Sequence, residues 1–166
     1  MELAGKILAG TAVTLLTLFI AWQIFIAFRI GALEREYGGL LDFSNFQLSW
    51  KPNQHLLAPA GATAASAHGE APLFAVAPEK LRDALLAVVE GEPRTRIVSR
   101  SGDSMAFTAV QQTALMRFPD FVSMEIRPVD GGSMLLVYSR AVFGVRDFGV
   151  NQKRVEDWIA RVRARL

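Results

Sequence analysis

The side chains best suited to chemistry gather between residues 138 and 154. They are Tyr138, Ser139, Arg140, Arg146, Asp147, Asn151 and Arg154. Arginines beside the free backbone amides of a helix N-terminus are a common way to bind phosphate or carboxylate. The stretch is therefore a candidate anion site in which Arg140 and Arg146 supply charge, while Tyr138 and Ser139 add hydrogen bonds.

The same residues also predict a purely structural corner between a strand and a helix. Arg140 and Asp147 have the chemistry of a bidentate ion pair. Gly144 and Gly149 permit tight turns around that pair, and Asn151 is a good N-cap for the helix that follows. Every residue then has a local structural role, so we favour the corner and keep the anion site as the alternative.

Known catalytic arrangements do not fit this chain. The triplet at 147–149 matches the magnesium-binding motif of kinases, but the glycine-rich and catalytic loops of kinases are missing. The two histidines, His55 and His68, fall in an expected loop. The sequence contains no cysteine, which excludes disulfides, thiol catalysis and cysteine-based metal sites. We expect a protein that is not an enzyme and that uses no metal or cofactor.

The elements around the stretch predict an α+β domain. Helices are expected at 78–90, where proline opens and glycine closes the segment, and at 151–166, which has an apolar stripe of helical period. Short connections between successive strands favour antiparallel neighbours. We therefore predict a four-stranded antiparallel sheet with both helices on one face, and the other face either open or covered by the loop before residue 72. The strands are expected at 95–100, 103–112, 121–129 and 133–143.

Two charged or apolar features have open interpretations. The last helix carries Arg154, Arg161, Arg163 and Arg165, which we expect on a solvated surface rather than on anionic lipid. The segment 115–118, Leu-Met-Arg-Phe, lies between two strands. It is either an exposed tip that enters lipid or docks on a membrane protein, or the end of a buried strand.

The N-terminus carries a long uncharged run from Ile7 to Phe28, 22 residues in all. A helix of that length spans about 30 Å of hydrocarbon. A cleaved signal peptide has a shorter apolar region that ends in small residues, so we predict an uncleaved single-span anchor. The chain then divides into an anchor (1–30), a connector and Ala/Pro/Gly-rich linker (31–72) and a domain (73–166).

The connector is rich in aromatic residues: Tyr37, Phe43, Phe46 and Trp50. They either lie in the lipid interface or contact a membrane partner, or they pack against the domain. Gly38-Gly39 is expected to end the helix that continues from the membrane. The stretch 51–72 lacks hydrophobic periodicity and is predicted to be an extended linker or a loop draped over the domain.

The stretch 138–154 closely resembles the C-terminal signature of the DUF1499 family, a domain of unknown function. The matching residues are Ser139, Arg140, Gly144, Asp147, Gly149, Val150, Asn151 and Arg154. The likeness extends over about residue 43 to the end, including Arg117-Phe118-Pro119-Asp120 and the Pro-Asn-Gln at 52–54. The resemblance to a bacterial, membrane-anchored branch implies a location and a fold more than an activity. Cysteines expected in that branch are replaced here, in the region of Ala58 and Thr63.

We expect a membrane-anchored accessory or binding protein, an auxiliary subunit or scaffold of a larger membrane complex. The alternative is a lipid- or small-anion-binding module that uses the open sheet face and the 138–154 corner. The formal charge is only +2, with acids nearly matching the cations, so nucleic acid is not an expected partner. The expected location is the bacterial inner membrane, with the C-terminal domain in the periplasm.

Overall fold

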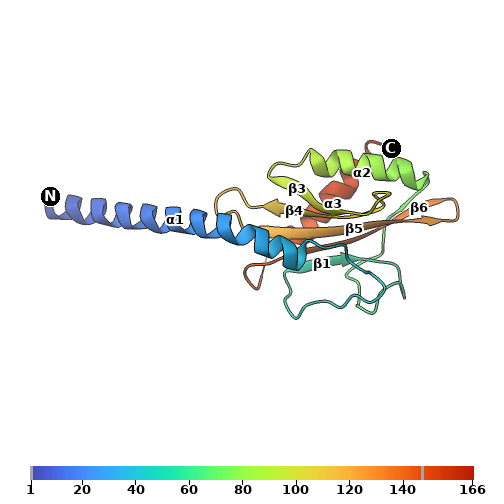
Figure 1. Ribbon diagram of the computed structural model, residues 1–166, viewed down its shortest axis with the longest axis horizontal. Coiled ribbons are helices and arrows are strands. Elements are labelled where there is room, and N and C mark those ends of the chain that lie inside the picture. Colours follow the sequence, from blue (N-terminus) through green and yellow to red (C-terminus); the bar gives the residue numbers. More distant parts are fainter. Residues whose placement is uncertain (1, 147) are drawn as a thin grey trace.

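The computed structural model describes residues 2–146 and 148–166. A long helix, α1 (Glu2–Tyr37), leads into an α+β unit, residues 38–166, which we call the head (Figure 1). The head contains α2 (Pro78–Glu90) and α3 (Val150–Arg163). Its strands are β1 (Gln54–Leu57), β2 (Leu73–Phe74), β3 (Thr95–Arg100), β4 (Ala106–Gln112), β5 (Pro119–Val129) and β6 (Gly132–Ala141). The predicted fold class is confirmed.

α1 is long and apolar enough to cross a membrane, and only 6% of its most apolar segment is buried. Its threonine side chains donate hydrogen bonds to backbone carbonyls one turn earlier in the same helix. Thr14 Oγ1, for example, donates to Gly10 O at 3.0 Å. The helix ends as predicted before Gly38-Gly39. Gly38 N donates to Glu34 O at 2.8 Å, and a Cβ at Gly38 would lie 2.5 Å from that carbonyl oxygen.

The sheet has six strands, so the prediction of four is wrong in number. The four predicted strands are β3 to β6, and they form the antiparallel meander. β1 and β2 both pair antiparallel with β6, Gln54 opposite Arg140 and Leu73 opposite Met134. These two strands are short and lack alternation of their own. They form because β6 offers a free edge whose backbone groups need partners.

Both helices pack on one face of the sheet, where side chains from alternate positions of the strands meet them. α2 contributes Leu81, Leu85, Val88 and Val89, and α3 contributes Val155, Trp158 and Val162. The sheet contributes Phe107, Ala109, Val122, Met124, Ile126, Leu135 and Val137. This cluster is the main core of the head, and it holds the N-terminal end of α3 against β5 and β6.

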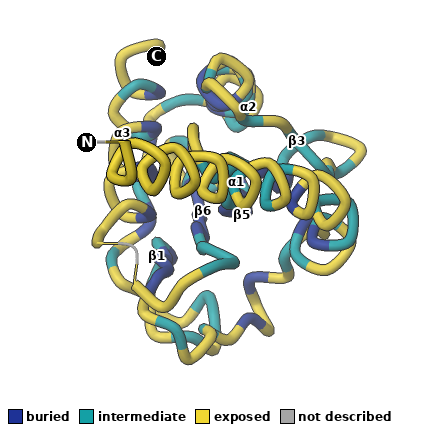
Figure 2. The backbone as a smooth tube through the Cα atoms, turned by 90° about the vertical axis from the view of Figure 1, so that its left-hand side faces the viewer, coloured by how far each residue is buried: buried dark blue, intermediate teal, exposed yellow. Residues whose placement is uncertain are grey.

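The second face of the sheet is covered rather than open. Phe43, Phe46 and Leu56 pack on Leu136 and Tyr138. Next to them, the last turns of α1 pack on the sheet through Leu33, which contacts Val110 and Phe121. Figure 2 shows α1 exposed along most of its length and buried positions concentrated in the strands behind it. An open sheet face is therefore not available to a ligand, and Phe43 and Phe46 belong to the head.

Candidate functional site

The predicted corner divides into two clusters because its first three residues are consecutive on β6. Side chains alternate along a strand, so Ser139 points toward α3 while Tyr138 and Arg140 point to the opposite face. The register of β6 against β1 and β5 fixes this arrangement: Ser139 lies opposite His55 on one side and Val122 on the other.

Arg154 is the centre of the cluster on the helix side. Its Nη2 lies 2.5 Å from Asp120 Oδ2, and both side chains are more than nine-tenths buried. Nε donates to Gln111 Oε1 at 2.6 Å. Nη1 donates to Ser139 Oγ at 3.0 Å and to Asn151 Oδ1 at 2.8 Å. The guanidinium is thus bonded on all three nitrogens, and the prediction that Arg154 belongs to a solvated basic surface is wrong.

Asn151 joins this cluster and does not cap its helix as predicted. α3 begins at Val150, and the N-cap position is Gly149, whose φ is 81°. The Asn151 carboxamide accepts a hydrogen bond from Ser139 Oγ at 2.6 Å and donates to Asn53 O at 3.1 Å. The Asn151 carboxamide cannot hold Ser139 and Asn53 and cap the helix at the same time. Because the carboxamide is buried, its hydrogen bonds to these two residues are the stronger requirement.

The Asn53 side chain extends the network to the loop that follows β6. Its Nδ2 donates to Phe143 O at 3.3 Å and to Gly144 O at 3.0 Å. The backbone carbonyl of Asn53 also accepts a hydrogen bond from Ala141 N at 3.0 Å. Gly144 has a φ of 79°, which a glycine adopts without strain. The segment before β1 therefore fixes the course of the loop between β6 and α3.

The second cluster lies on the other face around Tyr138. Its hydroxyl donates to Gln54 Oε1 at 2.6 Å, and Gln54 Nε2 donates to the carbonyls of Ser49 and Lys51 at 2.7 and 2.6 Å. The ring of Phe46 lies 4.4 Å from the Tyr138 ring. Burial raises the pKa of Tyr138 above its ordinary value, so the phenol stays neutral and serves as a donor.

Arg140 turns to the end of α1. Its guanidinium lies 4.7 Å from the centre of the Tyr37 ring and 5.6 Å from that of Tyr138, and its Nη2 donates to Tyr37 O at 3.2 Å. Arg146 is exposed in the loop after β6. The proposed pair between Arg140 and Asp147 involves a residue outside the described part of the chain.

These contacts are those of a structural corner. Tyr138, Ser139 and Asn151 are hydrogen-bonded to protein groups, and Arg154 is buried in an ion pair. Arg140 is held against Tyr37, whereas Arg146 is exposed. Sequence reasoning did not assign a role to Asp120, Gln111, Asn53 or Gln54. Asp120, Asn53 and Gln54 do fall in the Arg-Phe-Pro-Asp and Pro-Asn-Gln segments of the family resemblance, which was the available signal.

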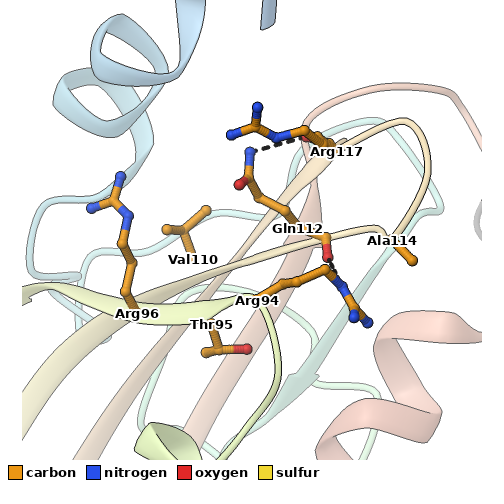
Figure 3. A pocket seen from close by; sticks show the side chains of 7 residues that line it. All are labelled: Arg94, Thr95, Arg96, Val110, Gln112, Ala114 and Arg117. Atoms are coloured by element: carbon orange, nitrogen blue, oxygen red, sulfur yellow. Dashed lines mark hydrogen bonds between the residues drawn. The ribbon is translucent and has the colours of Figure 1, made fainter. Parts of the chain in front are cut away.

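A different set of cations surrounds a cavity of about 380 Å³ at the edge of the sheet. We call it the basic cavity; its lining is Arg94, Thr95, Arg96, Val110, Gln112, Ala114 and Arg117. Figure 3 shows Arg96 and Arg117 on either side of Val110, with Arg94 turned the other way beyond Gln112. The sequence analysis missed this site because its residues come from three separate segments. Within residues 2–146 and 148–166, no group of three or more His, Asp or Glu side chains is arranged to hold a metal ion.

The comparison with protein families gives a match. The family model described as "Protein of unknown function (DUF1499)" matches residues 47–162. Neither the curated proteins nor the solved structures give a match. The matched region contains both clusters of the corner and the basic cavity, whereas α1 precedes it. Since the match covers well over half of the sequence, the chain belongs to the DUF1499 family.

Proposed function

We propose that this protein is a single-pass, membrane-anchored accessory protein without catalytic activity, and that its head binds a larger membrane complex. The observation that carries the proposal is the continuity between the apolar helix and the head. Ile26 and Leu33 of α1 are 0% and 5% exposed, although the first of them lies within the uncharged run. A helix that contributes core residues to the folded head is suited to be a permanent anchor.

The same observation argues against removal of the N-terminal run as a signal peptide. Cleavage after residue 28 would remove Ile26 and also Trp22, whose Nε1 donates to Met116 O of the head at 2.7 Å. It would expose Phe118 and Phe143, whose rings contact Trp22. Signal peptides are discarded before the mature protein folds, so they have no reason to complete its packing.

A binding role is favoured over catalysis by the state of the polar side chains. Both clusters of the corner are satisfied by protein groups, and neither presents a nucleophile beside a base. The head instead exposes single large apolar side chains, Trp50 and Leu73 among them, at 80% and 61%. Tryptophan is among the residue types that most often carry the binding energy of a protein interface.

For the location we propose the bacterial inner membrane, with the short N-terminal end in the cytoplasm and the head in the periplasm. The support is the family resemblance to an anchored branch, because Lys6 on one side of the run is offset by Arg29 and Arg35 on the other. Protease added to intact cells whose outer membrane has been opened should digest the head. Digestion only after the inner membrane is also opened would reverse the orientation.

Extraction in a gentle detergent, followed by native size separation, tests the accessory role. We expect the full chain to migrate with a large assembly and to carry copurifying membrane proteins. Migration as a free monomer would contradict the role. A carbonate wash tests the anchor separately: the full-length chain should stay with the membranes, and release into the wash would contradict a span.

A further inference from the structure

The loop between β4 and β5, residues 113–118, lies beside the apolar part of α1 rather than beyond it. Two hydrogen bonds fix it there. Trp22 Nε1 donates to Met116 O at 2.7 Å and Gln23 Nε2 donates to Leu115 O at 2.9 Å. Both donors belong to the uncharged run of α1, so this loop extends along the segment that would lie in the membrane.

The described residues of the loop between β6 and α3, 142–146 and 148–149, begin on the same part of the helix. The rings of Phe143 and Phe118 lie 5.9 and 5.4 Å from that of Trp22 and 5.5 Å from each other. Together we call the two loops the proximal rim. Figure 1 shows them on either side of α1, reaching toward its N-terminal end. The exposed Phe148 also belongs to this rim.

The position of the rim along α1 fixes its depth. Trp22 precedes Phe28, the end of the uncharged run, by six residues, which corresponds to about 9 Å along a helix. The headgroup layer on each side of a bilayer is about 5–7 Å thick. With Arg29 at the water side of the headgroup layer, the tip of the rim reaches the border of the hydrocarbon, where Leu115, 68% exposed, can enter it.

The basic cavity begins at the loop between β4 and β5, which contributes Ala114 and Arg117 to its lining, and so lies beside the part of α1 near the headgroups. Arg96 is paired with Glu34 of α1, so its charge is balanced. Arg94 donates through Nε to Gln112 O at 3.2 Å, a neutral acceptor, and the structure gives the Arg117 side chain no protein partner among the residues that it describes. Among the described residues neither guanidinium has an acidic partner, and the two lie on opposite sides of Gln112 (Figure 3).

The backbone at these two arginines adds a second argument. Arg94 and Arg117 have φ values of 56° and 55°, in the left-handed region where glycine and asparagine are favoured. Both positions nevertheless carry an arginine that lines the basic cavity. Strained conformations of this kind persist where a side chain is used, and a guanidinium fork matches the oxygens of a phosphate.

We propose that the basic cavity binds the phosphate of an anionic lipid headgroup, while the apolar side chains of the proximal rim enter the edge of the hydrocarbon layer. This inference rests on the proposed anchoring by α1, since only an anchored head places the cavity at the headgroups. The bound lipid would fix the head against the bilayer surface and present its distal surfaces to a protein partner.

Titration of the full chain in uncharged detergent micelles tests the proposal with three probes. They are short-chain phosphatidylglycerol, short-chain phosphatidylcholine and inorganic phosphate, with binding followed by calorimetry. We expect phosphatidylglycerol to bind most tightly. Since one cation near an anionic surface contributes about fivefold in affinity, the double variant Arg94→Gln/Arg117→Gln should weaken that binding about 25-fold. The variant Arg163→Gln/Arg165→Gln, at the far end of α3, removes the same charge and should bind like the parent.

Three results would overturn the inference. They are equal binding of the two lipids, inorganic phosphate binding as tightly as phosphatidylglycerol, and equal losses in the two double variants. Each of them leaves the anchor intact, because retention of the chain in liposomes through a carbonate wash is measured separately. Loss of that retention would instead contradict the proposed function.

Discussion

The corner around Arg154 and the proximal rim use the same kinds of residue in opposite ways. In the corner, the guanidinium of Arg154 is buried and bonded to Asp120, Gln111, Ser139 and Asn151. In the rim, Arg117 is left for a ligand beside apolar side chains that no core covers. A recognisable sequence signature therefore marks the part of the head that holds the fold together. The surface suited to binding includes Leu115 and Arg117, in the segment 115–118 that the sequence left open between an exposed tip and the end of a buried strand.

The largest effect is expected from Arg154→Ala, because it leaves the buried Asp120 carboxylate without its partner. Removing one member of a buried ion pair costs about 3–5 kcal/mol of unfolding free energy. The measurement is chemical unfolding of the full chain in detergent, followed by near-ultraviolet circular dichroism.

Arg161→Ala on the same helix is the matched control, because that arginine is half-exposed and pairs with Glu92. It should cost about 1 kcal/mol or less. The double variant Arg154→Leu/Asp120→Leu should recover much of the lost stability, since a buried pair is often replaceable by apolar groups. Equal costs for Arg154→Ala and Arg161→Ala would remove the distinction between corner and surface.

Gly38→Ala acts at the junction between α1 and the head. The added Cβ would lie 2.5 Å from Glu34 O and 2.9 Å from Val98 Cγ2, so the helix end or the sheet edge must shift. Such overpacking costs about 1–3 kcal/mol. Gly39→Ala is the control, because a Cβ there meets nothing within 4 Å. Thermal unfolding that is equally lowered in both variants would show that the junction is not tightly packed.

Tyr138→Phe should have a smaller effect, about 0.5–1.5 kcal/mol, because it removes one hydrogen bond while Ser49 N still donates to Gln54 Oε1. Burial raises the pKa of Tyr138 above its ordinary value of 10.0. Its contribution is therefore fully present below pH 10 and is lost as pH rises through the folded-state pKa. The stability difference between parent and variant should shrink as the pH rises above 10, and a difference that grows would be contrary to the assignment.

The smallest effect on stability is expected from Arg117→Gln, since a half-buried side chain outside the core changes unfolding by about 0.5 kcal/mol or less. The same variant should weaken binding of short-chain phosphatidylglycerol about fivefold. Calorimetry and thermal unfolding on one preparation give both numbers. A loss of stability without a loss of binding would assign Arg117 a structural role like that of Arg154.

Elements with local signals were predictable from the sequence. α2 has the predicted bounds because Pro78 suits the first turn and Gly91 ends the helix, and β3 has the bounds expected from the hairpin at Ser101-Gly102. β1 was not predictable, since its four residues become a strand only by pairing with β6, more than 80 positions later.

The candidate site was predictable in its members on β6 and α3 but not in its partners. Ser139, Asn151 and Arg154 do meet, as their spacing across one strand and helix suggests. Asp120 comes from the start of β5, 34 residues before the arginine that it pairs with. Nothing local in the sequence identifies that pairing, which is why Arg154 was expected on the solvated surface and Asn151 was expected to cap α3.

The measurement that tests this account most directly is the depth of two labels in a bilayer. The chain has no cysteine, so Leu115→Cys and Asp130→Cys each carry a single spin label, at opposite ends of β5. In liposomes, collisions with dissolved oxygen and with a water-soluble nickel chelate report depth. We predict a label at 115 that is protected from nickel and accessible to oxygen, and a label at 130 with the reverse behaviour. Equal, water-like accessibility at both positions would contradict a head seated on the membrane.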